Sequence, residues 1–367
     1  MSGSSLDGVD LALCQYSLDE EGAWSFRIRE VETRSFDSHW QQTLAGLHAR
    51  SGAELARAHV EFGHLLGRWI CEFQERISCA GTFVAVHGHT VFHRPDQHYT
   101  FQLGDGETIA SYCDCPVISN FRAKDMALGG QGAPLVPCGE RSLFSETACF
   151  LNLGGIVNLT TPTAAFDVCV GNQMLNTLAA RVDSKFSYDP EGSLAASGRV
   201  DESLLRALGS LDFFSVRPPK SLGREWVEKY LHPLVIESSR SNQDLLATFV
   251  EHIATEISRA VVESTRSPDR LLASGGGCLN VHLVSRIRSK LEKSGFSLVT
   301  AESEEQVLYK EALIFGYLGL LNLLRKSNID AALTGARASC VGGSVHWPLN
   351  EGRLDRDNFS VIGLGRD

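Results

Sequence analysis

The chain has 367 residues, a length that predicts two domains or one large domain. Apolar residues make up 43% of the chain and charged residues 21%, the balance of an ordinary globular protein. The formal net charge of −10 argues against a nucleic-acid partner, since such binding rests on basic surfaces, but it leaves room for a local nucleotide pocket.

The sequence carries no sign of export or of a membrane anchor. Its longest apolar run, residues 312–324, is too short to span a bilayer and is interrupted by Asn322. The first ten residues have neither a basic start nor an apolar core, so they do not resemble a secretory signal. Ten cysteines without an export signal are best interpreted as reduced thiols, which predicts a cytoplasmic location and no membrane partner.

Hydrophobic periodicity predicts strands and helices in alternation, typical of an α/β fold. Two strands come first, and an amphipathic helix with apolar residues at the 3.6-residue period follows at residues 54–77. A second long helix is expected at 245–262, and a third at 307–324, which is apolar nearly all round and hence buried. The expected strands are residues 9–13, 24–31, 82–86, 117–119, 150–153, 159–160, 165–168 and 271–274. The polar, aperiodic segment 349–367 indicates a loose tail.

Two blocks of the chain share one pattern of strand, glycine turn and strand, with an acidic residue at a turn. They are residues 3–10 and residues 151–172, and they share almost no identity. The shared pattern suggests two similar halves that face a cleft, the common position of a ligand in a two-domain α/β enzyme.

The first of three glycine-rich turns, residues 2–10, could hold phosphate. Gly3 and Gly8 allow backbone N–H groups to point into a concavity, Ser4 and Ser5 add donors, and Asp7 could organise hydrated Mg²⁺. A second turn, residues 167–172, offers another carboxylate after a strand. In a third, residues 274–280, consecutive glycines allow close approach of a base or ribose. Together the three turns favour phosphoryl transfer.

Histidines and cysteines offer a metal site as an alternative interpretation. Three imidazoles, His87, His89 and His93, could bind a transition metal, but no carboxylate or thiolate lies nearby to complete the site. We favour a cleft-lining or structural role for them. Cys113 and Cys115 form a lone C-x-C pair, which we interpret as small buried hydrophobes.

Other polar residues fall between the turns. Arg122 could grip a carboxylate or phosphate with two donors, and Gln131 could donate to a sugar hydroxyl; the alternative is a charged helix end followed by a linker. Lys310 and Glu311 open the most apolar helix. Either both stay solvated, or Glu311 faces a polar cleft, because an unpaired buried carboxylate is costly.

An ordered set of strings resembles one family. In chain order they are MSGSSLDGVD, FRAKDMALGGQGAPLVP, LNLGGIVNLT, FDVCVGN, PKSLGRE, SGGGCLN, KEALIFGYLG and LTGARASCVGG. They resemble the anhydro-N-acetylmuramic acid kinase family, within the sugar kinase, Hsp70 and actin superfamily, from residue 1 to about 348. The resemblance implies a two-domain, RNase H-like α/β fold with ATP and sugar in the interdomain cleft. The N-terminal lobe would comprise 1–130 and 308–348, the C-terminal lobe 131–307, and the polar tail 349–367.

The resemblance also implies an activity, its cofactors and a small-molecule partner. ATP with Mg²⁺ would phosphorylate 1,6-anhydro-N-acetylmuramic acid while water opens its anhydro ring. The products would be N-acetylmuramic acid 6-phosphate and ADP, in the recycling of cell-wall sugar. Catalysis would rest on positioning and charge stabilisation in a closed cleft. The family further suggests a homodimer.

The resemblance assigns site residues to three roles. Those expected at ATP are Gly3, Ser4, Ser5, Leu6, Asp7, Gly8, Asp10, Gly171, Gly275, Gly276 and Gly277, with Asp7 holding Mg²⁺ through water. Those expected at the sugar are Arg122, Gln131, Asn152 and Glu311, and those expected in catalysis are Arg122, Asp167, Asn176 and Glu311.

The sequence departs from the family pattern at the position of the base. The family has Asp where this chain has Asn176, and an amide cannot accept a proton at neutral pH, so Asn176 can only orient water. Glu311 or Asp183 could replace the base. Cys169 and Val170 replace a Gly-Pro pair of the family pattern, so we expect an altered phosphate contact in the second turn.

Two further departures affect the polar network and the first turn. Asn120 replaces the usual Asp before Phe-Arg, which we expect to weaken the network around Arg122. In the superfamily the first turn follows a central strand, so we expect the true start about 5–10 residues upstream. Asn176 keeps two alternatives open: a kinase for another (anhydro)sugar, or a catalytically weak nucleotide-binding homologue.

Overall fold

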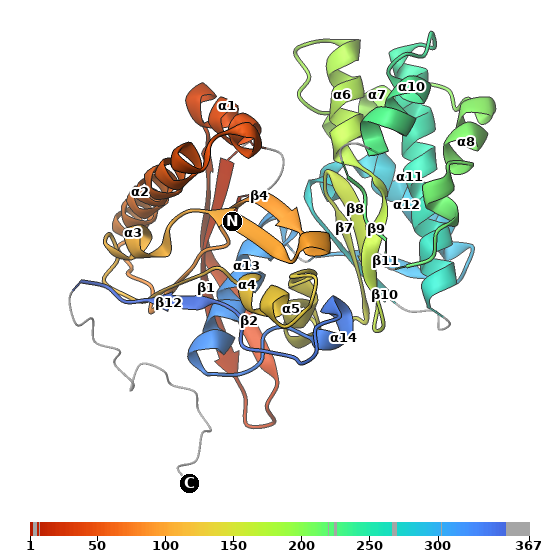
Figure 1. Ribbon diagram of the computed structural model, residues 1–367. Coiled ribbons are helices and arrows are strands. Elements are labelled where there is room, and N and C mark those ends of the chain that lie inside the picture. Colours follow the sequence, from red (N-terminus) through yellow and green to blue (C-terminus); the bar gives the residue numbers. More distant parts are fainter. Residues whose placement is uncertain are drawn as a thin grey trace. The chain divides into compact units, whose positions relative to one another are not determined.

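The computed structural model describes residues 1–2, 6, 8–218, 220–223, 226–265, 270–301 and 303–349 (Figure 1). These residues form two compact units. Unit 1 contains residues 1–145 and the chain from Tyr309 onward, and unit 2 contains residues 146–308. The fold is mixed α/β in both units, and the tail predicted at 349–367 lies outside the described residues except for Leu349.

Residues 131–145, which we expected in the C-terminal lobe, belong to unit 1. Helix α5 (Val136–Leu143) packs on helix α13 (Glu304–Leu323). Nζ of Lys310 lies 2.5 Å from Oε1 of Glu140, and both side chains are almost fully buried. A Cβ on Gly139 would lie 2.6 Å from a methyl group of Ile314. This close approach and the buried ion pair hold α5 in unit 1.

Unit 1 contains two small sheets, a hairpin and several helices. Strand β1 (Gly8–Leu18) pairs antiparallel with β2 (Trp24–Ser35), and a second sheet has the order β12 (Ser344–His346), β6 (Val117–Ser119), β3 (Val84–Ala85). The hairpin consists of β4 (His89–Arg94) and β5 (Tyr99–Leu103). The other helices are α1 (Ser38–Gly46), α2 (Gly52–Arg76), α3 (Gly106–Ala110), α4 (Ala123–Ala127) and α14 (Ala331–Thr334).

Helix α2 shows how the sequence sets one of these elements. It begins after Ser51, whose hydroxyl accepts from the N–H of Glu54 while the Glu54 carboxylate accepts from the N–H of Ser51, a complete capping box. Its apolar face buries Phe62, Leu66 and other residues in the unit 1 core.

Unit 2 is built on one five-stranded sheet. Its order is β11 (Ser297–Thr300), β10 (Arg270–Ser274), β7 (Cys149–Leu153), β8 (Ile156–Thr160), β9 (Ala165–Val170), and only β8 runs against the others. The helices are α6 (Asn172–Val182), α7 (Ser193–Ser197), α8 (Glu202–Gly209), α10 (His232–Val235), α11 (Asn242–Ser264) and α12 (Val281–Glu292).

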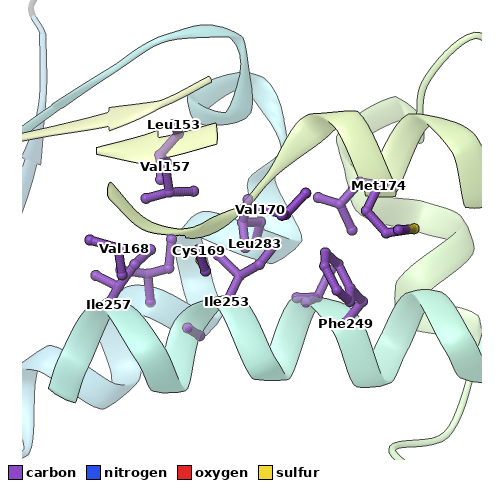
Figure 2. Packing of buried hydrophobic residues seen from close by; sticks show 14 of the residues in the cluster. Leu153, Val157, Val168, Cys169, Val170, Met174, Phe249, Ile253, Ile257 and Leu283 are labelled. Carbon is purple, nitrogen blue, oxygen red and sulfur yellow. The ribbon is translucent and has the colours of Figure 1, made fainter. Parts of the chain in front are cut away.

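Helix α11 carries the core of unit 2. Ile253 and Ile257 point from α11 toward Val168 and Cys169 of β9, as Figure 2 shows, and all four are buried. The predicted helix at 245–262 is therefore confirmed, three residues longer at its start and two at its end. No helix in the described ranges is long and apolar enough to cross a membrane.

Candidate active site

Arg122 is the centre of a polar cluster in unit 1. Its Nη1 donates to the carbonyl oxygen of Gly132 at 2.6 Å, and its Nη2 lies 3.2 Å from Nε2 of His87. Burial lowers the pKa of Arg122 to about 10, and the nearby Glu311 charge acts in the opposite direction, so the guanidinium stays cationic at neutral pH. Its Nε is buried and has no partner among the described residues. The cluster thus presents a fixed cation with a donor left for a ligand.

His87 is a neutral member of this cluster. Its ring stacks on Phe315 with centroids 4.3 Å apart, and burial, together with the charge of Arg122, holds the pKa of His87 well below its usual value. Because a guanidinium can only donate, Nε2 of His87 must be the acceptor and Nδ1 must carry the hydrogen. Nδ1 is buried without a partner in the described part of the chain, so it is a second donor left for a ligand.

Gly132 is held from two sides by side chains one helical turn apart. Arg122 binds its carbonyl oxygen, and the buried Asp125 accepts its N–H at 2.7 Å. The second oxygen of Asp125 accepts from the Thr334 hydroxyl at 2.7 Å. A Cβ on Gly130 would collide with the Asp125 carboxylate, which explains glycine there. Asp125 therefore fixes the GGQG loop against the C-terminal end of α14.

Glu311 lies on α13 in unit 1. Burial raises the pKa of Glu311, while the charges of Lys310, Arg122 and the Met1 amino group oppose that rise. A carboxylate with increased proton affinity beside a permanent cation suits general acid–base chemistry. Arg122 and Glu311 therefore influence each other's pKa, and their assignment to the site stays a prediction.

The remaining predicted residues of the first turn are only partly described. Gly3, Ser4, Ser5 and Asp7 lie outside the described residues. Leu6 has a φ of +57°, and a Cβ on Gly8 would lie 2.9 Å from the carbonyl carbon of Arg34. The Asp10 carboxylate accepts from the Thr33 hydroxyl at 2.7 Å, which ties it to β2.

The three histidines do not form a metal site. His87 faces Arg122, His89 Nδ1 lies 3.3 Å from the Ser2 hydroxyl, and His93 Nδ1 lies 3.2 Å from that of Thr100. Within the described ranges no group of three His, Cys, Asp or Glu side chains could hold a metal ion. The positive charge of Arg122 beside His87 and His93 is the physical reason against a cation here.

In unit 2 the carboxyl ends of β7, β9 and β10 lie at one edge of the sheet, because these strands run in the same direction. There the N–H of Gly171 donates to Gly155 O at 2.8 Å, and the N–H of Asn172 donates to Gly154 O at 3.0 Å. A Cβ on Gly171 would lie 2.6 Å from Gly154 O. The β7–β8 turn is thereby fastened to the N-terminus of α6. Because Gly154 and Gly155 accept the first N–H groups of α6, what favours an anion there is the positive end of the helix dipole.

The third glycine turn packs against the same edge. Gly275 has a φ of +85°, and a Cβ on it would collide with the side-chain oxygen of Asn152. A Cβ on Gly277 would lie 2.7 Å from that of Leu153, and one on Gly276 would lie 3.8 Å from the Asn172 amide nitrogen. Two of the three predicted turns therefore converge in unit 2 on a surface of backbone and amide groups, which can approach a phosphate or ribose closely.

The family of the chain is decided by comparison with known proteins. The model of the anhydro-N-acetylmuramic acid kinase family matches residues 1–348 of this chain. The chain is 31% identical over 370 residues to the anhydro-N-acetylmuramic acid kinase of Coxiella burnetii, with 95% of this chain and 96% of that one covered. It is 33% identical over 375 residues to that of Mannheimia succiniciproducens, with 94% and 97% covered.

The chain belongs to the anhydro-N-acetylmuramic acid kinase family. As a member of that family it is an ATP-using kinase. Among solved structures, the activator of the 2-hydroxyisocaproyl-CoA dehydratase from Clostridium difficile with bound ADPNP is a remote likeness, with a TM-score of 0.36 and 11% identity over 81% of this chain and 91% of that one.

Asp167, expected in catalysis of the family reaction, is occupied by protein donors. Its carboxylate accepts from the N–H of Leu222 at 2.7 Å and from the amide of Asn158. Burial raises the pKa of Asp167, and these two donors oppose the rise. In this structure Asp167 ties β9 to the loop at 220–222.

Cys169 and Val170, which we expected in the second glycine turn, are the last two residues of strand β9. Cys169 and Val170 pair with Val157 and Ile156 of β8, and both are buried. The turn itself begins at Gly171, where φ is −115°. No residue of β9 has a positive φ, so the backbone at Cys169 does not need the glycine that the kinase family has there.

Other residues predicted from the kinase family are placed as follows. Asn176 is exposed on α6, and Gln131 is exposed while its N–H donates to Thr334 O at 2.9 Å. Asp183 follows α6, and its carboxylate accepts from the N–H of Lys185 at 3.0 Å, so it stabilises a local turn. Asn120 has a φ of +56°, a conformation that Asn tolerates better than most residues.

Sequence reasoning missed three polar residues of the site regions. Asp125 and Thr334 hold the GGQG loop, and Ser274, at the end of β10, has a buried hydroxyl without a described partner. Asp125 gave only a weak signal, because it stands between Lys124 and Met126 and the sequence does not show that its carboxylate is buried. Nothing in the sequence pairs it with Thr334.

Proposed function

We propose that the chain transfers the γ-phosphoryl group of ATP to 1,6-anhydro-N-acetylmuramic acid while water opens the anhydro bridge. The products are N-acetylmuramic acid 6-phosphate and ADP, in the recycling of cell-wall sugar. The observation that carries this proposal is the unit 1 cluster, in which Arg122 and His87 leave two buried donors beside Glu311. All ten cysteines are free thiols, which supports the cytoplasm as the location.

The proposed reaction has two bond changes. Water adds to the anomeric carbon, the bond from that carbon to O6 breaks, and O6 takes the γ-phosphoryl group as ADP leaves. The proton lost by water goes to a base, and Glu311 is the described carboxylate of this cluster whose pKa is raised by burial. Arg122 balances the negative charge that develops on the departing O6. Asn176 can orient water but cannot accept its proton.

The unit 2 turns supply the proposed phosphate contacts. The glycine surface at 275–277 would lie against the anionic groups of ATP, and the positive end of the α6 dipole would favour their charge. Mg²⁺, when bound, would neutralise the phosphates; its expected ligand Asp7 lies outside the described residues, and the Asp10 carboxylate is committed to Thr33. A homodimer stays a prediction of the family alone.

One assay tests the proposal. ADP release is measured with purified protein, ATP, Mg²⁺ and 1,6-anhydro-N-acetylmuramic acid. The mass of the product is determined by mass spectrometry. We expect ADP release that depends on the sugar, and a product heavier than the substrate by one phosphoryl group (HPO₃) and one water. No ADP release above a sugar-free control, with ATP binding intact, would favour the weak nucleotide-binding homologue.

The amide at Asn176 supports a second candidate, a kinase for another sugar that needs no water activation. A product that gains phosphate without water, from a reducing sugar, would identify that activity. The variant Asn176→Asp separates the two candidates further. We expect it to keep ATP binding and to speed anhydro-ring opening, because a positioned base typically contributes about 10²–10⁴-fold. If Asn176→Ala turns over as fast as the parent protein, the position has no catalytic role.

A further inference from the structure

Helices α5 and α13 of unit 1 are joined by a buried ion pair. Nζ of Lys310 lies 2.5 Å from Oε1 of Glu140, and the two side chains are 4% and 3% exposed. Oε2 of Glu140 is also buried and receives no hydrogen bond from any described residue, so Lys310 is the described partner of this carboxylate. Apolar contacts join the same two helices, since Leu143 lies in one buried cluster with Leu313 and Tyr317.

The packing of α5 on α13 does not by itself require these two charges. Both ions lose their hydration on burial, and that loss can outweigh their mutual attraction. Apolar side chains of similar volume at such positions often stabilise a fold equally well. The charge of Glu140 therefore calls for a role beyond joining the two helices.

Glu311, the residue that follows Lys310 on α13, lies among charged groups. Burial raises the pKa of Glu311, the charges of Lys310, Arg122 and the Met1 amino group lower it, and that of Asp10 raises it. Of the three cations, Lys310 has the largest influence. Charges act on one another over several ångströms inside a protein, because the effective dielectric constant there is lower than in water. The proton affinity of Glu311 thus depends on how much of the Lys310 charge reaches it.

Glu140 limits that influence in two ways. Successive residues of an α-helix point about 100° apart, so Lys310 and Glu311 leave α13 in different directions. The bond to Glu140 holds Nζ of Lys310 on the side of α5. The negative charge of the Glu140 carboxylate also offsets the ammonium charge at any point farther away. A neutral side chain at position 140 would do neither.

We propose that Glu140 is a positioning residue for Glu311: through its ion pair with Lys310 it holds and offsets an ammonium group that would otherwise act on the Glu311 carboxylate. Its place in catalysis rests on the proposed function, in which Glu311 accepts the proton of water. A carboxylate near an unopposed cation is a weaker base, which accepts that proton less readily. This role requires the charge of Glu140 and not only its volume.

Three variants test this role. Glu140→Gln removes the charge of the side chain and keeps its shape. The double variant Glu140→Gln with Lys310→Met removes both charges and keeps a long, unbranched side chain on α13. Asp330→Asn is the matched control, because it removes the carboxylate from another ion pair of α5, in which Nη1 of Arg141 lies 3.0 Å from Oδ2 of Asp330.

Two measurements are made on each protein. The titration of the Glu311 carboxyl group is followed by ¹³C NMR, with its signal assigned by its loss in Glu311→Gln, and kcat/KM for the sugar is measured from ADP release as a function of pH. In Glu140→Gln we expect the Glu311 midpoint to fall by about one pH unit, because a nearby opposite charge lowers the pKa of a carboxyl group by about this much. The acidic limb of the kcat/KM profile should move to lower pH by the same amount. The double variant should return both to the parent values or above them, and Asp330→Asn should leave both unchanged.

An unchanged Glu311 midpoint in Glu140→Gln would overturn the proposal. An equal fall in the double variant would also overturn it, because loosened packing and not the Lys310 charge would then be the cause. A midpoint that falls while the kcat/KM profile stays in place would support the influence of the ion pair and contradict the proposed function, in which Glu311 is the base. If the parent protein releases no ADP, the proposed function fails and the NMR titration still decides the role of Glu140.

Glu140→Asp keeps the test decisive if Glu140→Gln does not fold. The shorter side chain keeps the charge but draws the carboxylate back from Nζ of Lys310. We therefore expect a fall in the Glu311 midpoint that is smaller than one pH unit, and no fall would overturn the proposal.

Discussion

The two units build their polar sites from different materials. In unit 1 the candidate site consists of charged side chains, Arg122, Asp125 and Glu311. Arg122 and Asp125 both bind Gly132, and Arg122 and Glu311 influence each other's pKa. In unit 2 the candidate site consists of backbone groups and amides at glycine turns, around Gly171 and Gly275. A side-chain site can be lost by truncation, because its chemistry lies beyond Cβ. A backbone site survives truncation and is lost only when something is added.

This difference fits the two ligands of the proposed reaction. A phosphate chain is recognised by N–H groups that any residue supplies, provided that the backbone can come close. A sugar that must be opened needs groups of defined charge and proton affinity. The comparison predicts opposite sensitivities to mutation in the two units.

The largest effect is expected for Arg122→Ala. It removes the cation and leaves the carbonyl of Gly132 and Nε2 of His87 without their donors. Bonds to a charged group contribute about 1.5–3 kcal/mol each, so kcat/KM for the sugar should fall at least about 100-fold. Arg122→Lys keeps the charge but loses the two-pronged geometry and should recover only part of the loss. A loss below threefold in Arg122→Ala, measured by ADP release, would contradict the side-chain site.

Gly275→Ala is expected to come next, and to act on ATP. The added Cβ meets the Asn152 side chain and a φ of +85° costs an alanine about 1–2 kcal/mol, so KM for ATP should rise about 30-fold. Gly335→Ala is the control, because Gly335 has a φ of +76° with nothing within 4 Å of its Cβ. The control should lower Tm slightly and leave KM for ATP unchanged. An equal rise in both variants would show that strain alone, not the site, is responsible.

Asp125→Ala should lower kcat/KM for the sugar about tenfold, because the N–H of Gly132 loses its acceptor and the loop that positions Arg122 loosens. Asp125→Asn is the sharper comparison. Its amide oxygen can accept from Gly132, and its NH₂ group can donate to the Thr334 hydroxyl, so a loss below threefold is expected. A large loss in Asp125→Asn would mean that the charge itself matters, and a steady-state assay with both variants decides this.

The smallest net effect concerns two groups of unit 2, His252 and Glu256, whose contributions to the pH dependence of stability oppose each other. His252 is buried beside Phe214, and burial lowers its pKa to about 3. Between pH 6.5 and 3 the unfolded chain binds a proton there that the folded chain does not, so stability falls on acidification by up to about 1.4 kcal/mol per pH unit. Glu256, with a pKa raised to about 7, acts in the opposite direction from pH 7 down to about 4.5.

The variant His252→Phe separates these two groups. Urea unfolding at pH 7, 6 and 5 should show a stability that declines less on acidification than in the parent protein, because only the opposing contribution of Glu256 is left. Identical pH slopes in the two proteins would show that His252 does not remain neutral in the folded chain.

Local patterns predicted much of the fold. The strand at 271–274 and the helix at 54–77 were recognised because periodicity and caps are properties of neighbouring residues. The hairpin of β4 and β5 was missed, because its histidines interrupt the apolar alternation on which such a prediction relies. The strand expected at 82–86 shortens to Val84–Ala85, since only those two residues pair in register with β6, at Val117 and Ile118.

By itself the amino-acid order determined the α/β class, the family and the candidates Arg122 and Glu311, because glycine turns and residue types in sequence are visible without coordinates. Only the tertiary structure decided that Thr334 meets Asp125 across 209 residues of chain, that Asp167 is held by Asn158 and Leu222, and that β1 lines a cavity of about 500 Å³. Such partners are chosen by packing, which brings together groups whose positions in the sequence carry no information about each other.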